Sequence, residues 1–210
     1  MGTAAYRKYP RSSDFGGRKV LNVGCGSIQW PAPNVVNLDK YANCNPNVIH
    51  DLNETPYPFE DETFDLVIAN HVMEHVENWW AAFNECARVC KVGGTVEVWV
   101  PGVDTDSSFG YRDHIHRINS MSFFGVKGTY RAKSNAWAVE NLKCHANRLE
   151  MKPLKIMLDD NFLNHMPQFV RQWAWKHLRN VTLEVGYIFT KISESEYVKE
   201  MGRYDAIPTY

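Results

Sequence analysis

Two glycines one residue apart follow a short apolar run near the start of the chain. Gly24 and Gly26 come directly after Val20–Val23, within the sequence VLNVGCGS. Glycines at such a turn let the backbone approach a ligand closely, and open α/β sheets bind ligands at the carboxyl ends of their strands. The pattern predicts a ligand-binding turn, although the two glycines taken alone are also compatible with a purely structural turn.

Acidic residues accompany the next two apolar runs. Asp39 ends the run Val35–Asp39, and Asp51 lies in the run Val48–Leu52. A carboxylate after the second strand of such a sheet is suited to hold the two hydroxyls of a ribose. An Asp after a strand also commonly binds the backbone of its own loop, and that interpretation stays open for Asp51. In this order, the glycine turn and the two acids indicate a ribose-containing cofactor.

Two common nucleotide motifs are missing. The third glycine of a dinucleotide fingerprint is replaced by Gln29. No G-x-x-x-x-G-K-[ST] sequence is present, so a P-loop is not predicted either. A nucleotide-dependent oxidoreductase is therefore disfavoured.

The elements that must position these residues alternate along the first half of the chain. Further apolar runs at 64–70 and 95–100 predict two more strands. Between them, apolar residues at three- and four-residue steps over 76–90 predict a helix, with Gly93-Gly94 as its C-terminal stop. A strand, a helix and a strand of these lengths imply a right-handed parallel crossover.

The second half of the chain carries mixed signals. Helical candidates lie at 120–124 and 136–144, a strand at 154–158, a helix from Pro167 to about Leu178, and an alternating strand at 181–189. With the five earlier strands, this layout predicts an α/β fold whose open, seven-stranded sheet is mostly parallel and has an antiparallel last strand.

The connections after the first two strands are short. Residues 27–34 include Pro31 and Pro33, and Lys40–Asn47 cannot hold a full helix. A parallel crossover usually needs about a dozen residues or more. We therefore predict that the helices after strands one and two are trimmed, with that face covered by short turns or by other elements such as Tyr6–Phe15.

Composition limits the function classes. The chain has 210 residues, 44% of them hydrophobic, and a net charge of −1, as expected for one domain spanning 1–210. The charge gives no support for nucleic acid as a partner. No apolar run is long enough to span a bilayer. The five cysteines show no C-x-x-C spacing, so we expect reduced thiols in a cytoplasmic protein. The sequence does not predict an oligomeric state.

The chain resembles the class I S-adenosylmethionine-dependent methyltransferases. The motifs that carry the resemblance are VLNVGCGS (20–27), VVNLD (35–39), HDL (50–52), FDLVIANHVMEH (64–75) and ARVCKVGGTVEVWVP (87–101). They are most similar to a branch with H-V-x-E-H after strand four. The resemblance implies a Rossmann-like fold, S-adenosylmethionine as cofactor and S-adenosylhomocysteine as product. It also makes 1–19 a candidate cover for the cofactor and 103–150 a substrate-side insertion.

Carried over residue by residue, the resemblance implies one set of cofactor-binding residues. The set is Asn22, Gly24, Cys25, Gly26, Ser27, Asp39, Lys40, Asp51, Leu52, Asn70 and His71. The glycine turn would follow the methionine part and the ribose, and Asp39 would take the ribose hydroxyls. Asp51 and Leu52 would meet the adenine, while Asn70 and His71 would line the methionine end and the entry for the substrate. Asn22 stands where the family usually has an acid, and an amide cannot pair with the cofactor's ammonium as a carboxylate would.

Three histidines are candidates for a general base. His71 follows strand four, and His114 and His116 lie in the sequence DHIHR at 113–117. A hydrogen-bonded loop explains His114 and His116 equally well, and a satisfied loop histidine is an equally good interpretation of His71. We interpret Glu74 and His75 as the start of the helix. No metal site is predicted, because His-x-His lacks a third ligand and Cys86 and Cys90 are expected to pack in the core.

These features predict transfer of a methyl group to a small-molecule or sugar-type acceptor. Asn70-His71-Val72-Met73 stands where a DNA amino-methyltransferase would have Asn-Pro-Pro-Tyr or Asp-Pro-Pro-Tyr. The carbohydrate class of acceptor follows from the branch that the chain resembles. The alternative is a non-catalytic protein that binds S-adenosylmethionine as a regulator or scaffold.

Overall fold

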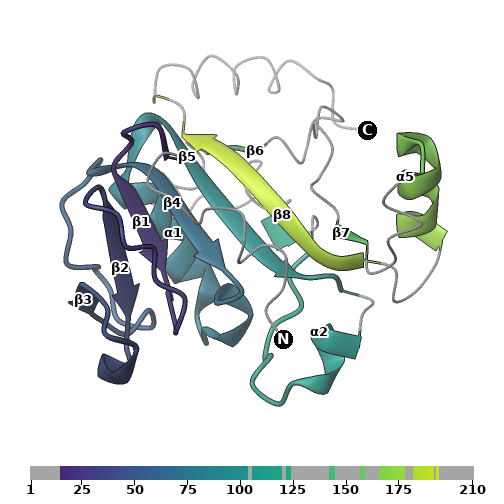
Figure 1. Ribbon diagram of the computed structural model, residues 1–210, viewed down its shortest axis with the longest axis horizontal. Coiled ribbons are helices and arrows are strands. Elements are labelled where there is room, and N and C mark those ends of the chain that lie inside the picture. Colours follow the sequence, from purple (N-terminus) through teal and green to yellow (C-terminus); the bar gives the residue numbers. More distant parts are fainter. Residues whose placement is uncertain are drawn as a thin grey trace, which may run out of the picture.

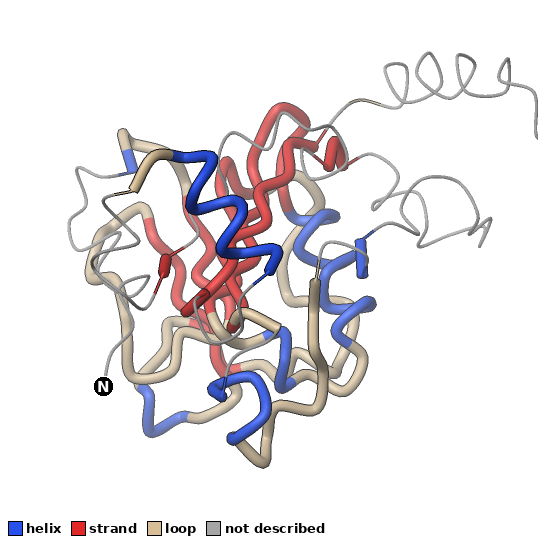
Figure 2. Tube along the Cα trace, turned by 90° about the vertical axis from the view of Figure 1, so that its right-hand side faces the viewer, coloured by secondary structure: helices blue, strands red, loops and turns tan. Residues whose placement is uncertain are grey.

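The computed structural model describes residues 15–103, 106–119, 122–123, 142–144, 157–158, 166–177, 182–191 and 193. Its strands are β1 (Val20–Val23), β2 (Val35–Asp39), β3 (Val48–Ile49), β4 (Phe64–Asn70), β5 (Cys90–Pro101), β6 (Leu142–Cys144), β7 (Met157–Leu158) and β8 (Thr182–Lys191). Its helices are the 3-10 helices η3 (Ala42–Cys44) and η4 (Met73–His75) and the α-helices α1 (Trp79–Val89), α2 (Asp106–Gly110) and α5 (Gln168–His177). The strands form a single central layer, with helices and loops outside it (Figure 2).

One mixed sheet contains all the described strands. Its order is β3-β2-β1-β4-β5-β8-β6, and β7 also pairs with β8. The first five strands are mutually parallel, and β8 runs antiparallel to β5. In Figure 1 the arrowheads of β1, β2 and β4 accordingly point to the same end of the sheet, and that of β8 points the other way. The predicted α/β sheet with late antiparallel pairing is confirmed.

The number of strands differs from the predicted seven. The described residues hold eight, because two short strands pair antiparallel with different stretches of β8. β6 pairs with residues 189–191 and β7 with residues 182–184. A single edge position is thus shared by two separate pieces of chain.

Strand boundaries agree with the sequence where the apolar run is continuous. β1, β2 and β4 begin and end at the predicted residues. β3 is shorter than predicted: it ends at Ile49, which is 61% exposed at the edge of the sheet. An edge strand is buried on fewer sides, so its apolar pattern says less about its length.

Both predicted ends of the central helix are wrong. α1 begins at Trp79, where the Asn78 side chain accepts a hydrogen bond from the backbone N–H of Ala81. It ends at Val89, and Cys90 is already part of β5. Residues 73–75 form a separate 3-10 helix, η4, so Glu74 and His75 do not start α1.

Gly93 and Gly94 lie inside β5 rather than at a helix end. The pairing of β4 with β5 passes from Phe64↔Cys90 to Leu66↔Thr95, so extra residues bulge out of β5 there. Gly93 has a φ of +79°, and a Cβ on Gly94 would lie 2.8 Å from Cys90 Sγ. The bulge, and not a helix stop, explains why this sequence needs glycine.

The two faces of the sheet are covered differently. On one face α1 contributes Phe83 and Cys86 to the larger core cluster (Figure 1). On the other face Phe15 and Trp30 pack on β1, β2, β4 and β5, with their ring centroids 5.6 Å apart. No helix connects β1 to β2, and only η3 connects β2 to β3. The predicted trimming is confirmed, and Phe15 supplies the part of the predicted Tyr6–Phe15 cover that falls within the described residues.

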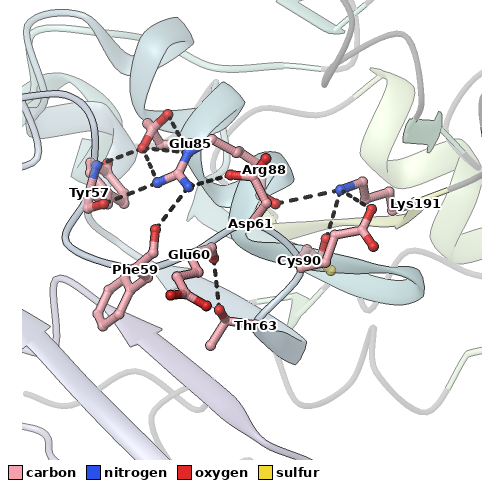
Figure 3. Close-up of polar contacts among 10 residues, drawn as sticks. Tyr57, Phe59, Glu60, Asp61, Thr63, Glu85, Arg88, Cys90 and Lys191 are labelled. Carbon is pink, nitrogen blue, oxygen red and sulfur yellow. Dashed lines mark hydrogen bonds and ion pairs between the residues drawn. The ribbon is translucent and has the colours of Figure 1, made fainter.

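Charged side chains bind the C-terminal end of α1 to the loop before β4 and to β8 (Figure 3). These contacts lie at the amino ends of the parallel strands. Arg88 donates to Glu85, to Asp61 and to the carbonyls of Tyr57 and Phe59. The Lys191 ammonium of β8 donates to the Cys90 carbonyl at 2.9 Å. This network fixes the loop before β4 and the junction between α1 and β5.

The later elements agree with the sequence in part. The helix after Pro167 is α5, and the alternating strand is β8, in which Tyr187 and Phe189 are buried and Ile188 is partly exposed. The predicted helix at 136–144 is wrong for residues 142–144, which form β6, and its other residues lie outside those described. Ser122 and Phe123 are in a 3-10 turn, and of the predicted strand at 154–158 only β7 is described. Among the described residues, no helix has the length and apolarity needed to cross a membrane.

Candidate active site

The glycine turn after β1 is bonded directly to the end of β2. The backbone N–H of Gly26 donates to Asp39 Oδ2 at 2.8 Å, and that of Cys25 donates to the Leu38 carbonyl at 3.0 Å. Asp39 Oδ1 accepts from the backbone N–H of Tyr41 at 2.9 Å. Each carboxylate oxygen keeps a further lone pair, so Asp39 is held in place and can still accept hydrogen bonds from a ligand.

The two glycines of the turn have different surroundings. Both have a positive φ, +62° at Gly24 and +52° at Gly26, which favours glycine. A Cβ on Gly24 would overlap Val72 Cγ2, so the loop after β4 packs against the turn at this point. A Cβ on Gly26 would meet no atom of the described residues within 4 Å. Among those residues, the backbone at Gly26 is therefore open to a ligand.

Asn22 lies under the turn and is tied to the neighbouring strand. Its Nδ2 donates to Asn37 Oδ1 at 2.9 Å and to the Ile28 carbonyl at 3.2 Å, and the residue is 2% exposed. Asn37 Nδ2 in turn donates to Asn47 Oδ1 at 3.0 Å and to the Trp30 carbonyl. Gln29, which replaces the third fingerprint glycine, donates to the Cys44 carbonyl. These amides fix the loop that takes the place of a helix after β1.

The residues expected at the adenine have local partners. Asp51 Oδ1 accepts from the backbone N–H of Asn53 at 2.9 Å, and this bond lowers the pKa of Asp51, with Lys40 acting in the same direction. Lys40 Nζ lies 3.8 Å from Asp51 Oδ2. Leu52 is 6% exposed and belongs to the larger core cluster. The loop-backbone interpretation of Asp51 is thus realised, and its Oδ2 faces Lys40.

Asn70 is the last residue of β4, and His71 follows it in the loop that packs on the glycine turn. Asn70 Oδ1 is buried without a hydrogen-bond partner among the described residues. His71 has a φ of +50°, and its backbone N–H donates to the Trp99 carbonyl of β5 at 2.9 Å. A buried acceptor with no partner is costly unless a ligand supplies a donor. A polar ligand group therefore fits beside Asn70, at the carboxyl end of β4.

The thiol and hydroxyl of the turn differ in exposure. Cys25 is buried, and burial together with the nearby Asp39 raises the pKa of its thiol to about 12. The thiol therefore stays protonated near neutral pH and is a poor nucleophile. Ser27 is exposed on the outer side of the same turn.

Two of the three candidate bases lie near one buried carboxylate. His71 Nδ1 is 3.4 Å from Glu74 Oε1, and Glu74 is 2% exposed. His114 interacts electrostatically with Glu74, and burial lowers the pKa of its imidazole. His116 Nε2 instead contacts the Glu77 carbonyl at 3.0 Å. The structure thus brings His71 and His114 together and directs His116 to a backbone partner.

Glu74 and His75 are the residues that the sequence did not predict for this site. Both stand on η4, and the segment after α2 docks there, because the backbone N–H groups of Ile115 and His116 donate to the Glu74 carbonyl at 2.9 and 3.1 Å. The acid and histidine of the H-V-x-E-H motif were visible in the sequence. Their burial was not visible in the sequence, because it depends on a segment that lies some 40 residues further along the chain.

Comparisons with known proteins agree with this geometry. Residues 31–98 match the model of a methyltransferase domain family. An uncharacterized protein of Methanocaldococcus jannaschii is 33% identical over 93 residues, which make up 43% of this chain and 38% of that protein. The aligned segment thus spans well under half of that relative.

Solved structures show the same fold at low identity. A S-adenosylmethionine-dependent methyltransferase from Archaeoglobus fulgidus aligns with a TM-score of 0.54 and 15% identity over 89% of this chain and 90% of that chain. A chain from the complex of the Haloferax volcanii Trm112 methyltransferase activator with a methyltransferase aligns with a TM-score of 0.52 and 12% identity, over 90% and 88%. The predicted Rossmann-like fold is confirmed: the chain shares its fold with these solved methyltransferases, and its residues 31–98 match a methyltransferase domain family, in agreement with the resemblance seen in the sequence.

Proposed function

We propose that the protein transfers the methyl group of S-adenosylmethionine to a small-molecule or sugar-type acceptor. The observation that carries the proposal is the bonded pair of the glycine turn and Asp39 at the carboxyl ends of β1 and β2. Open α/β sheets bind their ligands at this edge, with the acid after the second strand on the ribose. The unpartnered Asn70 Oδ1 supports a polar cofactor group at the end of β4.

In this proposal Gly24, Cys25, Gly26 and Ser27 follow the cofactor from its methionine part to its ribose. Asp39 accepts hydrogen bonds from the ribose hydroxyls. Around the adenine, Asp51 is the partner of the exocyclic amine, Leu52 lies at the ring face and Lys40 holds Asp51. Asn22 contributes by fixing the turn, since its amide is bonded to Asn37.

The cofactor supplies an electrophilic methyl group, and the protein positions the acceptor and excludes water. His71 and His114 are the proposed bases for an acceptor that must lose a proton, because both lie by the buried Glu74 at the end of β4. Residues 103–150 are the proposed substrate-side insertion, and the docking of residues 115 and 116 on η4 beside His71 supports this role. Residues 1–14 lie outside those described, so their role as a cover stays a prediction.

Binding of the cofactor is tested first, by calorimetry with S-adenosylmethionine and S-adenosylhomocysteine. Asp39→Ala removes an acceptor that is charged and bonded to two ribose hydroxyls, so affinity should fall by about 100-fold or more. The matched control is Asp65→Ala, which removes an aspartate at the other end of the sheet that is bonded to Lys91. Equal affinity in wild type and Asp39→Ala would refute the ribose assignment.

Turnover separates an enzyme from a binding protein. Methyl transfer from labelled S-adenosylmethionine to a panel of sugars, alcohols and small amines is expected for wild type and reduced in His71→Gln. Tight cofactor binding with no transfer to any acceptor would favour the regulatory or scaffold alternative.

A further inference from the structure

Three potential metal ligands converge where η4 meets the segment after α2. Glu74, His75 and His114 each offer one ligand atom, and these atoms all lie within 4.8 Å of one another. Two of the three are consecutive on η4, and the third is held there by the backbone bonds of residues 115 and 116 to Glu74. The cluster therefore joins two segments that are far apart in the sequence.

The carboxylate of this cluster lacks partners. Glu74 is 2% exposed, and neither of its side-chain oxygens accepts a hydrogen bond from a described residue. His71 Nδ1 lies 3.4 Å from Glu74 Oε1 and makes no hydrogen bond to it. A buried carboxylate in this state is unfavourable unless a cation or a proton compensates its charge.

The two imidazoles are arranged as ligands usually are. His75 Nδ1 contacts the Asp113 carbonyl at 2.9 Å and lies 3.3 Å from the Asp113 carboxylate, so Nδ1 is the donor in this contact and Nε2 is the nitrogen that could bind a metal ion. Histidines that bind metals typically donate their other N–H in this way. His114 Nδ1 is buried without a hydrogen-bond partner in the described part of the chain, so this nitrogen is available to a metal ion.

We propose that Glu74, His75 and His114 bind one divalent transition-metal ion such as Zn²⁺. Two imidazoles and one carboxylate suit Zn²⁺ or Fe²⁺ better than Mg²⁺ or Ca²⁺, which prefer oxygen ligands alone. Bonds of about 2.0–2.1 Å bring ligand atoms to within roughly 4 Å of one another, so binding draws the three groups slightly together. Three protein ligands leave a coordination position open.

If the proposed function holds, a metal ion at this site would lie close to the reacting groups. His71 links the cluster to the end of β4, and the next residue, Val72, packs on the glycine turn. Under the proposed function, a cation here would lie near the acceptor, and its open coordination position could bind a hydroxyl of an alcohol or sugar.

Binding is tested with metal-free protein and two probes, Zn²⁺ in calorimetry and Co²⁺ in visible absorption. Wild type should bind one equivalent of either ion, and the Co²⁺ spectrum should show nitrogen and oxygen ligands without a thiolate charge-transfer band. Affinity should fall at least about 100-fold in Glu74→Gln and in His114→Gln, since each loses a direct ligand and not merely a neighbour of one. His116→Gln is the matched control in the same segment, because its ring contacts the Glu77 carbonyl.

Each outcome decides the proposal. No binding of either ion by folded wild type would overturn it. Binding that survives both ligand substitutions, that is lost equally in His116→Gln, or that shows a thiolate band would place the ion elsewhere and also overturn it. The Co²⁺ spectrum of wild type keeps the test valid if a variant does not fold. Binding of S-adenosylhomocysteine is measured separately on metal-free protein, so a failed metal site and a failed cofactor site give different results.

Discussion

At the scale of single residues, the turn after β1 is the most constrained point of the proposed cofactor site. Gly24 and Gly26 share a left-handed backbone but not their surroundings. Val72 fills the space that a Cβ on Gly24 would need, whereas a Cβ on Gly26 would meet none of the described residues. Backbone conformation and packing therefore both require glycine at position 24, and backbone conformation alone requires it at position 26.

This difference predicts unequal costs for two identical substitutions. Gly24→Ala combines backbone strain with overpacking and should lower the free energy of unfolding by about 2–4 kcal/mol. Gly26→Ala carries only the strain, about 1–2 kcal/mol. Urea unfolding measures both. The double variant Gly24→Ala, Val72→Ala should recover part of the loss, and a strictly additive result would mean that the Val72 contact is not its cause.

His114 predicts how stability depends on pH. Burial holds the pKa of His114 below its ordinary value of 6.5. Between the folded value and 6.5 the unfolded chain binds more protons than the native chain, so the free energy of unfolding falls as pH falls through this window and levels off below it. His114→Gln in metal-free buffer should flatten this fall, as measured by urea midpoints from pH 7.5 to pH 5. An unchanged pH profile in the variant would show that the titrating group is another one.

At the scale of elements, the loop before β4 and the end of α1 are held by one guanidinium. Arg88 is bonded to two carboxylates and to two backbone carbonyls, and its side chain is 22% exposed. The Glu85 carboxylate also accepts from the backbone N–H of Tyr57 at 2.6 Å. The planar fork of arginine makes this set of bonds possible, and an ammonium cannot reproduce it.

Replacing Arg88 should therefore lower the free energy of unfolding more than replacing an exposed arginine would. Arg88→Ala should lower the free energy of unfolding by about 2–3 kcal/mol, because its carboxylate and carbonyl partners lose a charged donor. Arg88→Lys should recover only part of this loss. Arg112→Ala, an exposed arginine in the loop after α2, is the control and should stay within about 0.5 kcal/mol of wild type. Full recovery by lysine would show that charge alone matters at this position.

The elements also show what the sequence could and could not predict. Continuous apolar runs and polar ends located β1, β2 and β4 to the residue, and with them the glycine turn and Asp39. The sequence did not predict the bulge at Gly93 and Gly94. Glycine is required there by contacts with Cys90 and the neighbouring strand, and the local sequence pattern does not show these contacts. Glu74 was interpreted as a helix start for the same reason, since its burial depends on the docking of residues 113–116.

At the scale of the whole molecule, both faces of the sheet are buried although the described connections from β1 to β2 and from β2 to β3 contain no α-helix. Trp30 and Phe15 take over that face, and both are at most 5% exposed. The loop that carries Trp30 is the same loop that continues from the glycine turn, and Asn37 is bonded to the Trp30 backbone at both its N–H and its carbonyl. Cover for the sheet and support for the proposed cofactor turn are thus provided by one short segment.

This double role predicts that Trp30 affects both stability and cofactor binding. Trp30→Ala leaves a large cavity against β1, β2 and β4 and should lower the free energy of unfolding by about 3–5 kcal/mol. Because the loop then loses its anchor, affinity for S-adenosylhomocysteine should also fall, even though Trp30 is not one of the proposed cofactor contacts. Trp173→Ala on α5 removes a tryptophan that is 55% exposed and should change neither quantity appreciably. Urea unfolding followed by circular dichroism, with calorimetry on the folded fraction, measures both effects. A Trp30→Ala variant that loses stability but binds the cofactor like wild type would show that the turn is held by the Asn22–Asn37 bonds alone, without help from the apolar cover.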